Sequence, residues 1–279
     1  MKITIDKNAG FCFGVTKAIE LANDYLKNNN SLYCLGELVH NEEEMNKLKQ
    51  SGLKIISYND LDVINSSAIL FRAHGEPNAA YTKAKLLNNT IIDSTCPIVK
   101  QLQKKVVAAY NAGEKIFIYG KKTHPEVIGI IGNINDDAVV FDDVNELNYL
   151  HESDKITLYS QTTMQPDKYQ DVIKQLKDRG VIVNAIDSIC SSFNRRLIEL
   201  KDFCTRYDVI IIVAGKSSSN GKSLYSISKS INHHSYIVSS EEELQPEWFK
   251  GCNTVGISGA TSTPLSLLKR VERAIKKLV

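Results

Sequence analysis

The sequence has little that would place the protein in a membrane, on nucleic acid or outside the cell. None of its 279 residues lie in a run approaching the roughly 20 apolar residues that a membrane-spanning helix needs. The formal net charge is only +2, too small for a strong field toward nucleic acid or anionic lipid. The opening MKITIDKNAGFCFG has no basic segment followed by an apolar run, so no secretory signal is visible. We therefore expect a cytoplasmic protein with no nucleic-acid or membrane partner.

Cysteine is also sparse, with six residues dispersed through a chain too long to be a disulfide-stapled mini-protein. Half of them lie within or beside apolar runs and are expected to be buried packing thiols: Cys34, Cys204 and Cys252. The others lie in loops rich in Gly, Ser, Thr and Pro, each between a predicted strand and a predicted helix: Cys12, Cys96 and Cys190.

The segments around this second group repeat. After each cysteine comes a helical stretch, and then a predicted strand that ends in a polar loop, GELVHNE, GKKTHPE or GKSSSNG. These loops carry His40, His124 and Ser219, at 28, 28 and 29 residues after the preceding cysteine. A repeated thiol and a repeated polar anchor predict one shared site at a three-fold centre.

Strands alternating with helices predict parallel sheets covered by helices on both faces. The helices show apolar residues three to four positions apart, as at Val99, Leu102, Val106 and Ala109. The predicted fold is α/β, with three pseudo-repeated modules and mainly parallel sheets around a central cleft. The modules span residues 1–96, 97–189 and 190–279, and the third includes a closing C-terminal helix.

Three isolated thiolates at helix starts favour an iron–sulfur cluster with one iron left open, because cluster irons need deprotonated sulfur and a helix N-terminus lowers a thiol pKa. Zinc is the competing ligand, but zinc sites prefer local CxxC pairs, which this sequence lacks. Chance placement of small residues in tight turns is the structural alternative.

The polar loops form a second constellation. By position in the repeat, Thr162 in SQTTM and Ser262 in GATSTP match His74 in RAHGEP. Neutral or switchable donors at strand ends, with backbone amides of helix starts, suit a small and highly charged anion such as a diphosphate. Glu126, in THPE, is the candidate general acid, although it could simply complement the helix dipole.

Two nucleotide motifs are absent. GKSSSNGKS resembles a P-loop, but five residues separate Gly215 from Gly221 where that motif has four. No GxGxxG follows a strand, so a bound nicotinamide is not expected.

An ordered set of motifs covers essentially the whole chain: AGFCFGV, LVHN, AHG, DSTCP, THPEVIG, SQTT, the SIC cysteine, SSN and SGATSTP. In this the chain resembles the LytB-type 4-hydroxy-3-methylbut-2-enyl diphosphate reductases of the non-mevalonate isoprenoid pathway. The resemblance implies three α/β modules around a cleft that holds a 4Fe–4S cluster, ligated by Cys12, Cys96 and Cys190. The fourth iron would bind the substrate hydroxyl.

By the same resemblance, an allylic diphosphate would be held by His40, His74, His124, Ser218, Ser219, Asn220 and Ser262. Glu126 and Thr162 would relay protons beside the hydroxymethyl group, with His124 in the catalytic set. Ferredoxin or flavodoxin would supply two electrons, giving isopentenyl and dimethylallyl diphosphate. The family usually has a threonine shortly after the third cysteine, where this chain has Phe193, so Ser191 or Ser192 is the replacement candidate.

Two other functions use the same thiols. An iron–sulfur dehydratase would eliminate water without electron transfer, but a carboxylate substrate would call for more arginine than the single Arg72 beside the anchors of the first two modules. A cluster-based redox sensor would not need the ring of polar anchors.

Overall fold

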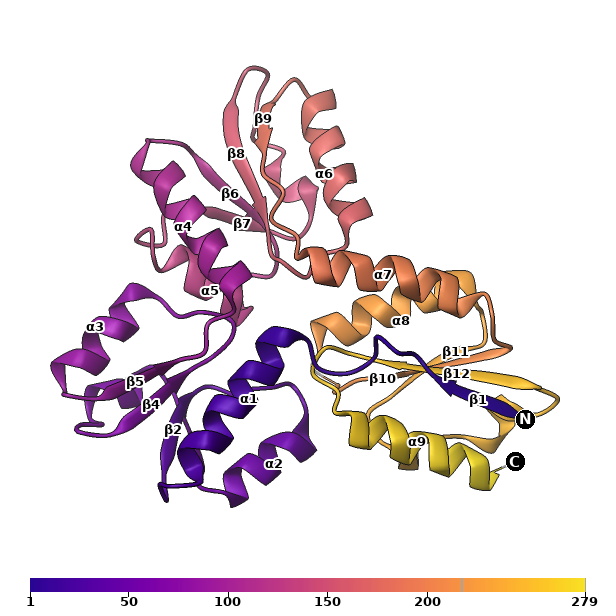
Figure 1. The fold of residues 1–279 in the computed structure, drawn as a ribbon. Coiled ribbons are helices and arrows are strands. Elements are labelled where there is room, and N and C mark those ends of the chain that lie inside the picture. The colour runs from indigo at the N-terminus through magenta and orange to yellow at the C-terminus, as the bar shows by residue number, and fades with distance from the viewer. Residues whose placement is uncertain (217, 279) are drawn as a thin grey trace. The chain divides into compact units, whose positions relative to one another are not determined.

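The computed structural model describes residues 1–216 and 218–278 and confirms an α/β fold. Its strands form three four-stranded sheets in which every pair of neighbours is parallel (Figure 1). The chain divides into two compact units. The first comprises residues 1–16, 39–50 and 191–279, and the second comprises residues 17–38 and 51–190. Among the described residues, no helix is long and apolar enough to cross a membrane.

Two of the sheets belong to the second unit. One has the order β3-β2-β4-β5, with β2 (Leu32–Leu35), β3 (Leu53–Ile56), β4 (Ala68–Phe71) and β5 (Thr90–Asp93). The other has the order β7-β6-β8-β9, with β6 (Ile116–Tyr119), β7 (Val139–Phe141), β8 (Lys155–Ser160) and β9 (Ile182–Ala185). The central strands β4 and β6 are buried along their whole length, as expected of parallel strands with both faces covered.

The third sheet lies in the first unit and has the order β1-β12-β10-β11. Its strands are β1 (Lys2–Ile5), β10 (Val209–Val213), β11 (Ser235–Val238) and β12 (Thr254–Gly259). The first strand of the chain therefore pairs with its last, Ile3 opposite Val255. Residues 1–96 were predicted to form one module, yet β1 adds an edge strand to the sheet of residues 190–279. The three predicted module boundaries themselves stay predictions.

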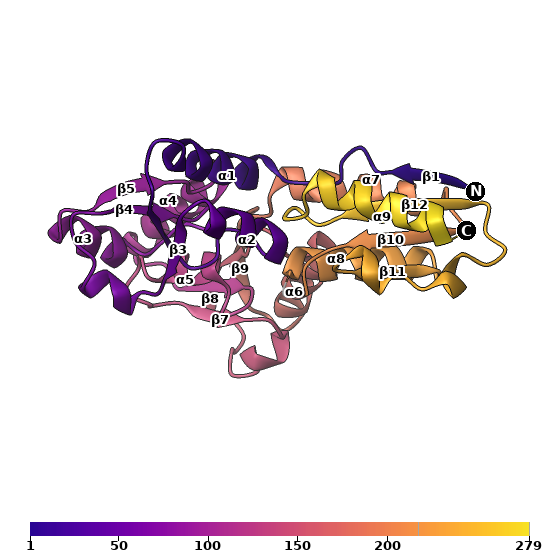
Figure 2. The ribbon, with the colours of Figure 1, turned by 90° about the horizontal axis from the view of Figure 1, so that it is seen from below.

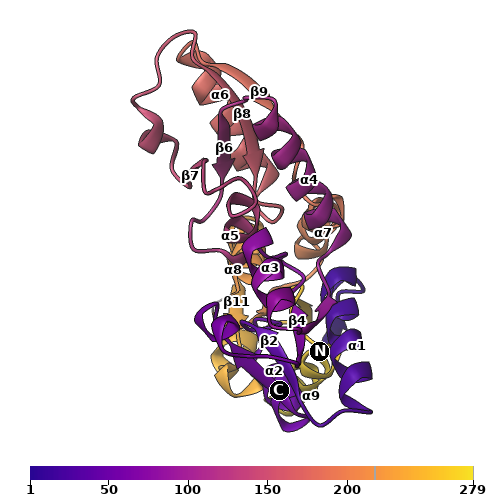
Figure 3. The ribbon, with the colours of Figure 1, turned by 90° about the vertical axis from the view of Figure 1, so that its left-hand side faces the viewer.

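Helices cover the sheets on both faces. In the first unit, α9 (Leu265–Leu278) lies on one face, beside β1 and β12, and α7 (Ser191–Cys204) and α8 (Ser219–Ile231) lie on the other (Figures 1 and 2). In the second unit, α4 (Pro97–Asn111) and α6 (Pro166–Asp178) flank the sheet of β6 to β9 (Figure 3). Apolar side chains of α6 enter that core at helical spacing: Tyr169, Val172, Ile173 and Leu176.

The remaining helices are short or join the units: α1 (Phe13–Leu26), α2 (Glu42–Gln50), α3 (Asn78–Leu86) and α5 (Pro125–Ile131). Single turns of 3₁₀-helix occur at Asn59–Asp62, Val144–Leu147, Glu241–Glu243 and Pro246–Phe249. Because the strands of each sheet run parallel, the loops after them gather at one edge. The predicted site residues lie in these loops or in the first turn of the helix that follows.

Candidate active site

The three predicted ligand cysteines share one backbone arrangement. Each lies immediately before a helix, and each donates its amide to a carbonyl in the loop after a neighbouring strand. Cys96 N donates to Ala73 O at 3.0 Å, and Cys190 N to Thr162 O at 2.9 Å. Cys12 N donates to Thr261 O at 3.3 Å. In every case the acceptor is the second residue beyond its strand, so the predicted three-fold repeat is present at the level of hydrogen bonds.

Two of the three cysteines predicted to be buried packing thiols are buried. None of the six cysteines forms a disulfide, and Cys12, Cys96 and Cys190 are partly exposed. Cys34 and Cys204 are buried, and burial raises the pKa of both thiols, that of Cys34 to about 12. Cys252 is partly exposed, contrary to the expectation of a buried thiol, and burial raises its pKa too.

The repeat also corrects two matches made from sequence spacing. The residue after β2, β6 and β10 donates its amide to an adjacent strand in all three copies, and the fourth residue beyond that donor is His40, His124 or Ser218. Ser218 therefore occupies the place assigned to Ser219, and the spacing from Cys190 becomes 28 as in the other copies. Likewise, Thr163 rather than Thr162 corresponds to His74 and Ser262.

In the second unit, the structure brings together His74 and His124. Their ring centroids lie 5.5 Å apart and the rings are nearly perpendicular, at 88°. Close backbone packing makes this possible: a Cβ added to Gly129 of α5 would lie 2.3 Å from the carbonyl oxygen of Gly75, so only glycine fits there.

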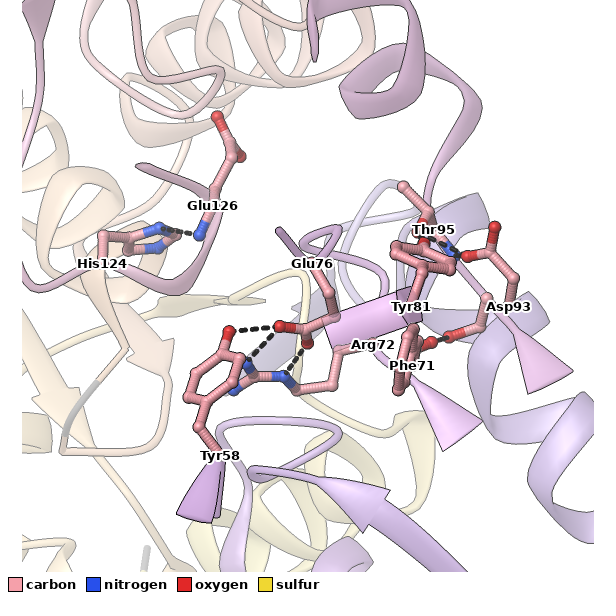
Figure 4. A network of polar contacts seen from close by, with 10 residues as sticks. Tyr58, Phe71, Arg72, Glu76, Tyr81, Asp93, Thr95, His124 and Glu126 are labelled. Carbon is pink, nitrogen blue, oxygen red and sulfur yellow. Dashed lines mark hydrogen bonds and ion pairs between the residues drawn. The ribbon is translucent and has the colours of Figure 1, made fainter. Parts of the chain in front are cut away.

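His124 is also the N-cap of α5, and its Nδ1 accepts a hydrogen bond from Glu126 N at 3.2 Å (Figure 4). Since Nδ1 is the acceptor, a neutral ring carries its proton on Nε2 and can donate from that atom.

Glu126 is fully enclosed, with 2% of its surface exposed, and its carboxylate is bound by one residue. Thr162 N donates to Oε1 at 2.7 Å and Thr162 Oγ1 donates to Oε2 at 2.6 Å. Burial raises the pKa of Glu126, while the two hydrogen bonds from Thr162 partly oppose the rise. The same threonine accepts the Cys190 amide, so the candidate acid is connected through Thr162 to one of the predicted ligand cysteines.

In the first unit, Ser218 caps α8, with its Oγ accepting from Gly221 N at 3.1 Å. The Asn220 side chain accepts from Thr261 N at 3.1 Å through Oδ1. His40 lies against the start of the same loop, since a Cβ on Gly215 would be 2.3 Å from its carbonyl oxygen. Ser219 is partly buried in the first turn of α8.

Two buried polar atoms of the predicted binding residues form no hydrogen bond within the described part of the chain. Asn220 Nδ2 and Ser262 Oγ are inaccessible and have no hydrogen-bond partner among the described residues. A buried donor without a partner costs about 1–3 kcal/mol, so it is retained where it serves a ligand. Ser191 and Ser192 are exposed in the first turn of α7, whereas Phe193 is 3% exposed in the core. The suggestion that Ser191 or Ser192 replaces the family threonine stays a prediction.

An ion pair that sequence reasoning missed supports the turn bearing His74. Arg72 Nε donates to Glu76 Oε1 at 2.8 Å, and the Tyr58 hydroxyl donates to the other carboxylate oxygen (Figure 4). Both charged side chains are buried. Gly36 allows the close approach, because a Cβ there would lie 2.2 Å from Arg72 Nη1. Charged residues four apart across an AHG turn are the only local signal of this pair.

We expect Arg72→Met to destabilise the protein by about 3–5 kcal/mol, because it leaves the Glu76 carboxylate buried without its cation. The free energy of unfolding in urea measures this. Arg206→Met is the matched control, since its pair with Asp202 is largely exposed and worth about 0–1 kcal/mol. Equal losses of stability in the two variants would contradict the stabilising role given to the buried Arg72–Glu76 pair.

The predicted site residues belong in part to one unit and in part to the other. Cys96, Cys190, His74, His124, Glu126 and Thr162 belong to the second, and Cys12, His40, Ser218, Ser219, Asn220 and Ser262 belong to the first. Within residues 1–216 and 218–278, no group of three or more His, Cys, Asp or Glu side chains is arranged as a metal site.

Comparisons with known proteins agree along the whole chain. The sequence model of the family described as LytB protein matches residues 3–276. A 4-hydroxy-3-methylbut-2-enyl diphosphate reductase of Bacteroides fragilis is 39% identical, over 99% of this chain and 98% of its own. The reductase of that name from Parabacteroides distasonis is 40% identical, over 100% and 98%.

Solved structures give the same likeness. One of (E)-4-hydroxy-3-methyl-but-2-enyl diphosphate reductase, described as the terminal enzyme of the non-mevalonate pathway, is 32% identical with a TM-score of 0.73, and covers 99% of both chains. One of E-1-hydroxy-2-methyl-but-2-enyl-4-diphosphate reductase from Plasmodium falciparum is 28% identical with a TM-score of 0.89, over 98% of this chain and 87% of its own.

Proposed function

The chain belongs to the LytB protein family, and we infer that it catalyses the reductive removal of the hydroxyl group of 4-hydroxy-3-methylbut-2-enyl diphosphate. This is the last step of the non-mevalonate isoprenoid pathway. Two electrons and two protons enter, a C–O bond is replaced by a C–H bond, and water leaves. The products are isopentenyl and dimethylallyl diphosphate. The observation that carries the proposal is the repeated cysteine loop, present three times with the same backbone hydrogen bond.

The donor set fits an iron–sulfur cluster. Each cysteine of the repeat is a partly exposed thiol outside any disulfide, and each lies immediately before a helix. Cys12, Cys96 and Cys190 would ligate three irons of a 4Fe–4S cluster and leave the fourth without a protein ligand. When bound, the cluster supplies the electrons and, at the open iron, a Lewis acid.

The diphosphate-binding role is proposed for the residues of the polar loops. A neutral His124 ring would donate to the diphosphate from Nε2, because Nδ1 accepts the Glu126 amide, and His74 lies beside it. His40, Ser218, Ser219, Asn220 and Ser262 supply the remaining donors. Neutral donors, together with the backbone amides at the starts of α5 and α8, suit the several charged oxygens of a diphosphate.

We expect Ser262→Ala to weaken substrate binding without weakening the fold. Its hydroxyl has no partner among the described residues, so its removal should leave the free energy of unfolding unchanged or raise it by about 1 kcal/mol. Loss of a hydrogen bond to a charged phosphate should raise KM about 10- to 100-fold.

The neighbouring Thr263→Val is the control for Ser262→Ala. Thr263 Oγ1 already donates to Val213 O at 2.8 Å, so this variant should lose about 1 kcal/mol of stability and keep its KM. A Ser262→Ala variant with the wild-type KM would remove Ser262 from the binding site.

Glu126 is the proposed proton source for the carbon–oxygen cleavage. A buried carboxyl with a raised pKa retains a proton at a higher pH than an exposed one, and Thr162 Oγ1, 2.6 Å away, can pass that proton on. Thr162 and His124 orient this group through their hydrogen bonds.

A small acidic one-electron carrier of the ferredoxin or flavodoxin type is the proposed donor, and the cytoplasm is the proposed compartment. Six cysteines outside any disulfide suit a reducing environment. Electron stoichiometry separates this function from a dehydratase. Anaerobic turnover should oxidise a reduced mediator by two electrons per substrate consumed, whereas substrate loss without mediator oxidation would establish the dehydratase.

A further inference from the structure

Arg196 of α7 is a buried cation that the proposed reaction does not yet use. It is 7% exposed, whereas the adjacent Arg195 faces solvent. A guanidinium remains charged in a protein, so burying it requires compensation by acceptors or anions.

The Arg196 fork joins the cysteine loop to the loop after β12. Nη1 donates to Gly10 O at 3.0 Å, and Nη2 donates to Gly259 O. Gly10 and Gly259 each lie two residues before a member of the hydrogen-bonded pair Cys12 N and Thr261 O. The guanidinium thus holds together the two backbone segments, at Gly10 and Gly259, that position the Cys12 loop.

These contacts do not use the whole guanidinium. Arg196 Nε is buried and has no hydrogen-bond partner among the described residues, and both acceptors of the fork are neutral carbonyls. The nearby carboxylate of Asp6 already accepts from Ser258 Oγ at 2.8 Å and from Asn8 N at 3.0 Å. Burial lowers the pKa of Arg196, while the charges of Asp6 and Cys12 act in the opposite direction.

We propose that Arg196 is a positioning residue that holds the Cys12 loop and places a permanent positive charge against the backbone of that loop, so that the reduced state of the bound cluster is favoured. This proposal rests on the cluster proposed above. Reduction adds a negative charge, and a fixed cation in a poorly solvated site stabilises that charge. Cluster potentials respond to the net charge around the cluster, and Arg196 supplies a fixed positive charge at the Cys12 loop.

The test is an anaerobic redox titration of the reconstituted cluster, followed by electron paramagnetic resonance, in wild type, Arg196→Gln and Arg195→Gln. The amide of Arg196→Gln removes the charge but still reaches one carbonyl. We expect its reduction equilibrium to be about tenfold less favourable, a midpoint about 59 mV more negative for one electron. The exposed Arg195→Gln control should match wild type.

An unchanged midpoint in a folded Arg196→Gln protein would overturn this inference alone. A wild-type chain that assembles no cluster would overturn the proposed cofactor and this inference with it. If Arg196→Gln does not fold, Arg196→Lys decides. It keeps the charge but reaches only one carbonyl. Its equilibrium constant for reduction should therefore stay within twofold of the wild-type value, while a chelator should remove its iron several-fold faster. Wild-type iron loss from Arg196→Lys would contradict the proposal.

Discussion

Cys96→Ser is expected to abolish turnover and to lower the iron content of the anaerobically reconstituted protein. Loss of a partner that merely orients a metal ligand costs about 10- to 100-fold, so loss of a ligand should cost more. The fold should survive, because Cys96 is the N-cap of α4 and serine is a favoured residue at that position. Iron and sulfide analysis with parallel assays measures both effects.

Cys252→Ser is the matched control for this variant. Cys252 is also a partly exposed thiol, but its Sγ only donates weakly to Trp248 O at 3.7 Å and Lys250 O at 3.8 Å. It should keep the iron and the activity of wild type. A Cys96→Ser protein that retained a complete and active cluster would remove Cys96 from the ligand set.

Glu126→Gln is expected to lower kcat by about 10²- to 10⁴-fold, the usual contribution of a positioned general acid. The amide keeps the shape of the side chain and one acceptor for Thr162, so substrate binding and the fold should change little. Asp171→Asn, an exposed carboxylate on α6 of the same unit, is the control and should have no effect. Wild-type kcat in Glu126→Gln would assign the proton to another group.

The pH dependence has a defined sign. Because burial raises the pKa of Glu126, the protonated and active form is lost as the pH rises through the folded-state value, and kcat should fall on the alkaline side. Folding stability follows the same direction, since a raised carboxyl pKa stabilises the fold at low pH and that contribution is lost as pH rises through the folded pKa. In Glu126→Gln, the residual kcat should therefore no longer fall as the pH rises. The free energy of unfolding of this variant should also decrease less at high pH than that of wild type.

Local signals in the sequence predicted much of this fold. Strands predicted before the three polar loops are β2, β6 and β10, and the helices predicted after the three cysteines and at the C-terminal end are α1, α4, α7 and α9. The pairing of β1 with β12 has no such signal, because it joins residues that are about 250 positions apart and depends only on tertiary packing. The short helix α5, seven residues long, carries too few periodic positions to be identified in this way.

The site residues stay predictions, but the structure shifts two of the matches between repeats by one residue, from Ser219 to Ser218 and from Thr162 to Thr163. Spacing alone could not separate Ser218 from Ser219, whereas the N-cap bond to Gly221 distinguishes them. The buried cations Arg72 and Arg196 were not predicted, since an arginine in a helix or after a strand is usually exposed. Only three-dimensional contacts with Glu76 and with the Gly10 and Gly259 carbonyls identify them.

The most direct test is anaerobic turnover of 4-hydroxy-3-methylbut-2-enyl diphosphate by the cluster-loaded wild-type chain in deuterium oxide, with a chemically reduced mediator and mass analysis of the products. The reaction proposed here predicts isopentenyl and dimethylallyl diphosphate, each carrying one solvent-derived deuterium in the new C–H bond. Unchanged substrate in the presence of a complete, reduced cluster would contradict the assignment.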